Sequence, residues 1–190
     1  MRSDPNERMT IGVPRIRRAD AADAHAIAEI VVHGWQTAYR GILPDDFLAG
    51  LSVSAREVAW RMRLESGADA ADPIWVAERA GAVIGFVSCG PPRDEELQST
   101  ARDGYRLGAE IYAIYVDSNS WRSGTGRALL KTAIAYLHSR GAEILVLWVL
   151  EKNANGRAFY EAMSWRPDGA RQSVDFGDFT VPEVRYRLSL

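Results

Sequence analysis

The sequence predicts an α/β (α+β) fold in which a mixed, mostly antiparallel central sheet is flanked by helices. Three observations carry this prediction. Two strand-like segments, 74–79 and 82–90, are separated by a short turn, as in an antiparallel hairpin. The segment 143–150 is almost uninterruptedly apolar, as in a central strand that is covered on both faces. Apolar residues recur with helical spacing at 20–35 and 124–140.

The chain begins with a polar segment, residues 1–13, that we expect to be a flexible leader. A single domain is predicted over 14–190. Its first element is a short strand at 15–20, where polar and apolar residues alternate. Asp20 is then expected to cap an Ala-rich helix that runs to about Trp35.

The middle of the chain contains a second helix, predicted from a capping box formed by Ser54 and Glu57 and expected to end at Gly67. The hairpin described above follows it. The polar segment 91–108 shows no clear element, and we expect it to be a mobile loop near the functional site. A further strand is predicted at 109–116.

The C-terminal part begins with the long helix of the central region, which Gly141 is expected to end. A short helix is predicted at 156–163, and a turn at 166–169. Two strands, near 171–176 and 183–190, close the chain. These strands offer an edge on which two copies could pair, so a homodimer is a possible assembly.

Composition excludes several classes of function. The 190 residues carry a formal charge of −2 and no run of arginines, which argues against nucleic acid as a partner. No segment has the roughly 18 consecutive apolar residues of a membrane span. The single cysteine, Cys89, cannot form an internal disulfide, which suits a reducing, cytoplasmic location. The three histidines lack metal-ligand spacing, so no metal site is predicted.

The segment "NSWRSGTGRALL", residues 119–130, lies between a predicted strand and a predicted helix. The first amides of a helix are unpaired and attract an anion, and Gly124 and Gly126 let the backbone approach a diphosphate. Arg122 and Arg127 add cationic donors for phosphate oxygens. The alternative is a tight turn that packs helix on strand. A P-loop or a dinucleotide fingerprint fits the residues poorly.

Three stretches in order resemble one family: "AEIYAIYVDSNSWRSGTGRALL" (109–130), "LWVLEKNANGRAFYEAMSW" (147–165) and "WQTAYRGILPDDFL" (35–48). They are similar to the GNAT (GCN5-related N-acetyltransferase) superfamily, over about residues 14–189. Several positions depart from the family's pattern. Trp121 replaces the usual Gln or Arg, Ser164 and Trp165 replace Gly-Phe, and Gly156 stands where Ala is common.

This resemblance implies an enzyme that transfers acetyl from acetyl-CoA, its co-substrate, to a primary amine of a small molecule or peptide by direct attack in a ternary complex. It implies that two neighbouring strands splay apart at the CoA site. The residues expected to bind the pyrophosphate are Trp121, Arg122, Ser123, Gly124, Thr125, Gly126 and Arg127. Backbone groups of Ile114, Tyr115 and Val116, and the side chain of Asn153, are expected along the pantetheine arm.

The resemblance also implies the catalytic residues. Glu110 matches the family's base, which acts directly or through water; its alternative is an edge-strand carboxylate that faces solvent. Tyr160 matches the tyrosine that contacts CoA and donates a proton to its sulfur, and its alternative is a core aromatic. Asn153 has the alternative of a helix cap.

Aromatic residues are the candidates for the acceptor pocket: Trp35, Tyr39, Tyr112 and Trp148. Aromatics at such spacing are also typical of a core. Two alternatives to the acetyltransferase remain at this point. One is an acyltransferase that uses another acyl-CoA, and the other is a CoA-binding regulatory module without turnover.

Overall fold

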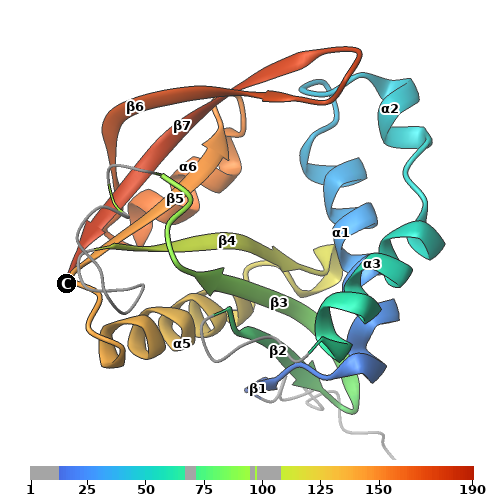
Figure 1. The fold of residues 1–190 in the computed structure, drawn as a ribbon. Coiled ribbons are helices and arrows are strands. Elements are labelled where there is room, and N and C mark those ends of the chain that lie inside the picture. Colours follow the sequence, from blue (N-terminus) through green and yellow to red (C-terminus); the bar gives the residue numbers. More distant parts are fainter. Residues whose placement is uncertain (1–12, 67–71, 95–96, 98–107) are drawn as a thin grey trace, which may run out of the picture.

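The computed structural model describes residues 13–66, 72–94, 97 and 108–190. Within this part of the chain, seven strands form one sheet in the order β1-β2-β3-β4-β5-β7-β6 (Figure 1). Only the β4–β5 pair is parallel. The predicted fold class, a mixed and mostly antiparallel sheet flanked by helices, is therefore confirmed. The strands are β1 (Arg15–Arg18), β2 (Ile74–Arg79), β3 (Ala82–Gly90), β4 (Gly108–Val116), β5 (Ile144–Leu150), β6 (Arg166–Asp175) and β7 (Thr180–Ser189).

Helices cover both faces of the sheet, with α1 and α3 on one face and α5 on the other (Figure 1). The helices are α1 (Ala24–Ala38), α2 (Asp45–Ala49), α3 (Val53–Glu65), α5 (Thr125–Ser139) and α6 (Ala154–Ala162), with short 3₁₀ turns at Ala21–Asp23 and Ser118–Ser120. Strand alternation divides the core between these faces. On β3, Phe86 packs toward α1, whereas Val87 and Cys89 pack toward α5.

Strands β4 and β5 pair only over their first halves. Their register runs from Gly108 opposite Ile144 to Ile111 opposite Leu147, and no later pair joins them among the described residues. Beyond this point β4 stays paired with β3, and β5 with β7. The two strands therefore diverge, as Figure 1 shows, and the predicted splay is present.

A β-bulge marks the start of the divergence. Ser88 pairs with Ala113 and Cys89 pairs with Ile111, so Tyr112 is an extra residue on β4. A bulge bends its strand and increases the local twist. The bend turns the second half of β4 away from β5, so the two strands no longer pair with each other there.

The N-terminal predictions need two corrections. Asp20 does cap the first helical turn, accepting a hydrogen bond from the Ala22 amide, but α1 continues past the expected end to Ala38. The cap of α3 is Ser52, not Ser54, because Ser52 has the extended backbone of a cap and accepts from the Ala55 amide. The short helix α2 was not predicted.

The predicted turn at 166–169 is wrong, because this segment lies inside β6 as an irregularity. Gly169 takes a positive φ of 93°, and the Asp168 carboxylate accepts a hydrogen bond from the Ala170 amide. The leader predicted at 1–13 and most of the loop predicted at 91–108 lie outside the described residues.

Ser164 closes α6 in the left-handed conformation, with φ at 69°. The Trp165 amide donates to the Tyr160 carbonyl, and the Ser164 amide donates to the Glu161 carbonyl. These bonds resemble a Schellman cap, whose left-handed residue is usually glycine. The family's glycine at this position therefore has a structural reason, and Ser164 adopts the same conformation with some strain.

We predict that Ser164→Gly raises the free energy of unfolding by up to about 1 kcal/mol, because glycine takes a positive φ without a steric penalty. Urea denaturation measures this change. The control is Ser173→Gly in β6, where glycine should lower stability by about 0.5–1 kcal/mol. A loss of stability in both variants would contradict the interpretation.

Candidate active site

The N-terminus of α5 lies between the end of β4 and α6, since a Cβ at Gly126 would lie 3.7 Å from Val116 and 3.4 Å from Phe159. Gly124 is its N-cap, with a left-handed φ of 84°, and no side chain caps the first amides. The 15-residue helix therefore presents the amides of residues 125–127 and the positive end of its dipole to an anion. This is the arrangement expected of a pyrophosphate loop.

The two glycines of this loop have different surroundings. A Cβ at Gly124 would meet nothing within 4 Å, so this residue faces open space. A Cβ at Gly126 would lie 3.4 Å from the ring of Phe159. Gly126 therefore lets α6 pack closely against the first turn of α5, while Gly124 leaves room for a ligand.

Two hydroxyl side chains hold the loop in shape. The Ser123 hydroxyl donates to the Ser120 carbonyl at 2.6 Å and lies 2.8 Å from the Thr125 hydroxyl. In contrast, the side chains of Arg122 and Arg127 lie on exposed residues at the loop surface. The hydroxyls of Ser123 and Thr125 thus stabilise the loop conformation, and the guanidinium groups of Arg122 and Arg127 are accessible to a phosphate.

Trp121, the departure at the loop's first position, anchors the loop to the end of β4. Its indole N–H donates to the Val116 carbonyl at 2.7 Å, and its ring remains 44% exposed. The loop therefore keeps a side-chain anchor although the usual Gln or Arg is missing.

Glu110 is fully buried on β4, two residues before the bulge. One carboxylate oxygen accepts from the Arg93 amide at 2.9 Å, and the other accepts from Arg93 Nε at 3.0 Å and from its terminal NH₂. This hydrogen bonding raises the pKa of the Arg93 guanidinium. The alternative of a solvent-facing edge carboxylate is therefore wrong, and Arg93 is a partner that no sequence pattern indicates.

Tyr160 projects from α6 among other aromatic rings. Its ring centroid lies 5.4 Å from that of Phe159 and 6.2 Å from that of Tyr186. Burial raises the pKa of the Tyr160 phenol above its usual value, and the phenol of Tyr115 raises it further. Tyr160 therefore keeps its proton at neutral pH and can act as a hydrogen-bond donor.

Three aromatic side chains meet beside the diverging end of β4. Trp35 Nε1 donates to the Tyr115 hydroxyl at 2.8 Å, and the hydroxyls of Tyr39 and Tyr115 are 3.1 Å apart. Burial raises the pKa of both phenols. The structure thus brings Trp35 and Tyr39 together, and it adds the side chain of Tyr115, for which only a backbone contact was predicted.

The other two predicted pocket aromatics are engaged elsewhere. The Tyr112 hydroxyl donates to the Pro91 carbonyl at 2.5 Å, and the Arg93 guanidinium lies over its ring. Trp148 lies beneath the guanidinium of Arg185, 5.7 Å from the ring centroid. Tyr112 therefore contacts the segment after β3 directly, and Trp148 packs on Arg185, which donates to Asp94 of that segment at 2.9 Å.

Glu183 is a carboxylate near this site that the sequence did not single out. It lies on β7 opposite Leu150 of β5, and its carboxylate accepts from the Gln172 amide at 2.9 Å. Burial raises the pKa of the Glu183 carboxyl, and its charge acts on the phenols of Tyr39 and Tyr115. The alternation of β7, which turns Val184 and Tyr186 toward the core, is the signal that places Glu183 on the opposite face.

Asn153 follows β5 and caps α6, since its side-chain oxygen accepts from the Gly156 amide at 3.0 Å. Asn153 therefore has the helix-capping role that was the alternative to pantetheine binding. A Cβ at Gly156 would lie only 2.5 Å from the Asn153 side-chain nitrogen. The glycine in place of the family's usual alanine therefore makes room for the cap.

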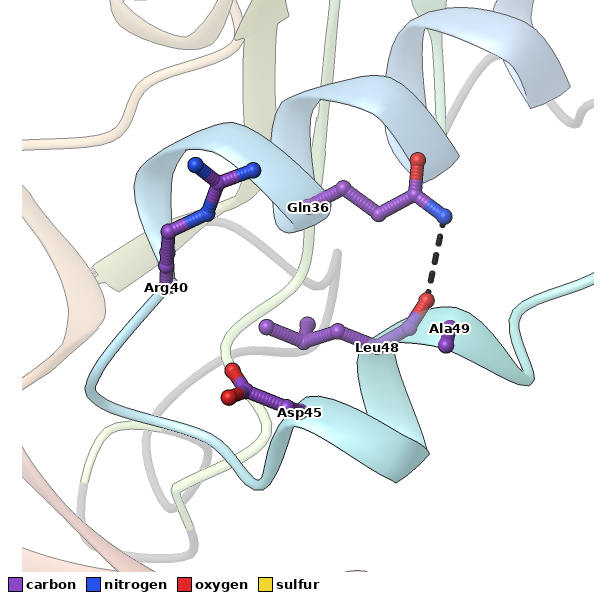
Figure 2. Close-up of a pocket in the computed structure, with 5 residues that line it drawn as sticks. All are labelled: Gln36, Arg40, Asp45, Leu48 and Ala49. Atoms are coloured by element: carbon purple, nitrogen blue, oxygen red, sulfur yellow. Dashed lines mark hydrogen bonds between the residues drawn. The ribbon is translucent and has the colours of Figure 1, made fainter.

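A shallow pocket of about 380 Å³ lies between the end of α1 and α2 (Figure 2). The residues that line it are Gln36, Arg40, Asp45, Leu48 and Ala49. The Gln36 side chain donates to the Leu48 carbonyl at 3.0 Å and bridges the two helices. None of the lining residues is a predicted site residue, but Leu48 packs in the same apolar cluster as Trp35 and Tyr39, so the pocket lies next to these aromatic side chains.

Comparison with known proteins identifies the family. The model of the acetyltransferase (GNAT) family matches residues 35–165. The chain belongs to this family. It is 35% identical over 150 residues to "Uncharacterized N-acetyltransferase YuaI" of Bacillus subtilis, covering 78% of each chain. It is 32% identical over 178 residues to "Probable N-acetyltransferase Rv2775" of Mycobacterium tuberculosis, covering 92% of each.

Solved structures agree with this assignment. YncA of Salmonella typhimurium, solved with its cofactor acetyl-CoA, is 25% identical and superimposes with a TM-score of 0.63 over 94% of this chain and 95% of its own. The PaiA N-acetyltransferase of Thermoplasma acidophilum, solved with coenzyme A, shares the fold with a TM-score of 0.69 at 16% identity, over 94% and 100% of the two chains. The predicted family and enzyme class, an acyltransferase, are therefore confirmed.

Two further features complete the description. No helix built from the described residues is both long and apolar enough to cross a membrane. Within the same residues, no cluster of three His, Cys, Asp or Glu side chains is arranged to hold a metal ion.

The contact between Asn153 and Gly156 yields a prediction about stability. Gly156→Ala should gain about 1 kcal/mol from helix propensity, but it displaces the Asn153 side chain and loses a cap of similar value. We therefore expect little net change in the native sequence and a gain of about 1 kcal/mol in an Asn153→Ala background. Urea denaturation of the four proteins of this cycle measures both values. Equal gains in both backgrounds would show that the cap and the glycine are independent.

Proposed function

We propose that this protein is an N-acetyltransferase that transfers the acetyl group of acetyl-CoA to a primary amine of a small molecule or peptide, by direct attack in a ternary complex. The observation that carries the proposal is the opening between β4 and β5, which has the uncapped N-terminus of α5 beside it. The match to YncA, which was solved with acetyl-CoA, supports the same ligand. When bound, acetyl-CoA supplies the thioester carbonyl that the amine attacks.

The groups proposed to bind acetyl-CoA fit its chemistry. The exposed guanidinium groups of Arg122 and Arg127, together with the first amides of α5, suit the phosphates. The edge of β4 that no longer pairs with β5, at residues 114–116, suits the amides of the pantetheine arm, in the manner of an added strand, with the Val116 carbonyl already bonded to Trp121. Asn153 contributes its remaining side-chain N–H groups, since its oxygen is used by the cap.

Glu110 is the proposed base, because an amine with a pKa near 10 is mostly protonated at neutral pH and must lose a proton before it attacks. Both oxygens of Glu110 are bonded to Arg93, so one of them has to be released before it accepts a proton, directly or through water. The Arg93 side chain is 64% exposed. Its movement therefore leaves the core packing intact.

Tyr160 is the proposed acid for the CoA sulfur. Its phenol keeps its proton at neutral pH because burial raises the pKa. It lies on α6 beside Phe159, whose ring faces Gly126 in the first turn of α5. A protonated phenol at this place can hydrogen-bond the departing thiolate and donate a proton to it.

Two other functions fit the same fold. An acyltransferase that uses a longer acyl-CoA would need the same loop and the same acid. A regulatory module that binds CoA without turnover would need the loop alone. Separate measurements of acetyl-CoA binding and of turnover therefore distinguish an enzyme from a regulatory module.

We predict micromolar binding of acetyl-CoA in a calorimetric titration, and weaker binding of CoA that lacks the 3′-phosphate. Arg127→Gln should weaken binding about ten-fold or more, because it removes a charge-assisted hydrogen bond. Arg140→Gln, at the other end of α5, is the matched control and should bind as the native protein does. The absence of acetyl-CoA binding would refute the proposed function, and "NSWRSGTGRALL" would then be only a turn before a helix.

We predict that Tyr160→Phe lowers kcat by about 10²-fold or more, because it removes the proton donor, while the affinity for acetyl-CoA stays unchanged. Release of free CoA thiol during acetylation of a panel of primary amines measures kcat. Tyr136→Phe on α5, whose ring packs against Trp75, is the control and should retain full activity. Acetyl-CoA binding without turnover in the native protein would favour the regulatory module.

A further inference from the structure

Glu183 lies on the same side of the sheet as the proposed acceptor site. Strand β7 turns Val184 and Tyr186 toward the α5 face, so Glu183 and its neighbour along the same face, Val181, lie toward α1 and α2. Glu183 lies opposite Leu150 of β5, and Leu150 belongs to the same apolar cluster as Tyr39. The Glu183 charge accordingly raises the pKa of the Tyr39 and Tyr115 phenols.

The carboxylates on this side of the sheet differ in how their charge is balanced. Glu110 is bonded on both oxygens by Arg93. Glu183 accepts a hydrogen bond from the neutral Gln172, and among the described residues no cation lies within ion-pair distance of it. The charge of Arg93 does act on Glu183, but its guanidinium is bonded to Glu110. Within the part of the chain that the structure describes, Glu183 is therefore a half-buried carboxylate without an ionic partner of its own.

The surroundings of Glu183 are largely apolar and aromatic. Its neighbour on β5, Leu150, belongs to a cluster that also contains Leu43, Val181, Trp35, Tyr39, Phe47, Phe176 and Phe179. Rings within this cluster pack edge to face at centroid distances from 5.1 to 5.5 Å. The aromatic members of this cluster are only partly buried, so their rings can contact the methylene groups of a ligand while the carboxylate binds its charge.

Tyr39 links Glu183 to the proposed reaction centre. The pKa of its phenol is raised both by Tyr160, the proposed acid for CoA, and by Glu183. The Tyr39 hydroxyl lies 3.1 Å from that of Tyr115 on β4, and the Tyr39 ring packs in the cluster that contains Leu150, the residue opposite Glu183. An acceptor that reaches from Tyr160 past Tyr39 brings its far end to Glu183.

We propose that Glu183 binds a second positive charge on the acceptor, so that the preferred substrates are amines that carry another cationic group. This inference rests on the proposed function, because it assigns Glu183 to the acceptor of that same reaction. The nitrogen that attacks the thioester must first become neutral, and a carboxylate paired with it would hold it in the charged form. Glu183 is therefore better suited to a distant ammonium that keeps its charge.

The test compares 1,4-diaminobutane with n-butylamine, which share a four-carbon chain and differ by one ammonium group. Calorimetric titration of each amine into the full-length protein measures affinity without turnover, in the presence and in the absence of CoA. We expect the dissociation constant of the diamine to be about ten-fold lower than that of the monoamine, because the diamine forms one additional half-buried ion pair.

Glu183→Gln should remove this preference, because it removes the charge and keeps the shape and an oxygen for Gln172. Glu183→Asp retains the charge and should keep part of the preference. The matched control is Glu151→Gln, since Glu151 is already paired with Arg171. This control should bind both amines as the native protein does.

Two results would overturn the inference. One is equal affinity of the native protein for both amines, including a lack of binding by either. The other is a preference for the diamine that persists in Glu183→Gln. Failure of the proposed function would instead appear as a lack of acetyl-CoA binding or of acetyl transfer. The diamine preference that depends on Glu183 is measured independently, so it can be present or absent whether or not the proposed function holds.

Discussion

The rest of the site depends on the divergence of β4 and β5, which leaves part of each strand without hydrogen bonds to the other. The strands are parallel neighbours up to Ile111 and Leu147, and beyond the bulge at Tyr112 each keeps only its outer partner. Backbone groups without partners are costly in a core but useful where a ligand adds its own amides. The same divergence opens the sheet beside the N-terminus of α5, so the strand edge and the anion site belong to one structural feature.

The two faces of the sheet have different proposed roles, one in binding the cofactor and the other in binding the acceptor amine. On the α5 side, the loop supplies cations and amides for phosphates, and α6 supplies Tyr160. On the α1 side, Trp35 and Tyr39 meet Tyr115, and the carboxylates Glu110 and Glu183 lie nearby. Among the described residues, Glu110 is held by an arginine and Glu183 is not. This difference assigns proton transfer to the first and recognition of charge to the second in our proposal.

Much of this arrangement was predictable from sequence, because it depends on local patterns. The glycine loop, the succession of most helices and strands along the chain, and the places of Glu110 and Tyr160 in it follow from periodicity and from the family resemblance. Other features depend on contacts between distant residues. Arg93 reaches Glu110 across 17 positions, and Glu183 approaches Tyr39 only because β7 lies beside β5. The cap of α3 at Ser52 and the irregular start of β6 at 166–169 were missed because several local patterns fit those residues equally well.

Hydrogen–deuterium exchange with and without CoA tests the central claim most directly, because it reads the backbone amides on which the account depends. We predict that CoA slows exchange at residues 113–116 of β4 and at the first turn of α5, while β2 and the far end of α5 remain unchanged. Protection confined to other parts of the chain, or no protection at saturating CoA, would contradict the claim that the opening between β4 and β5 is the cofactor site.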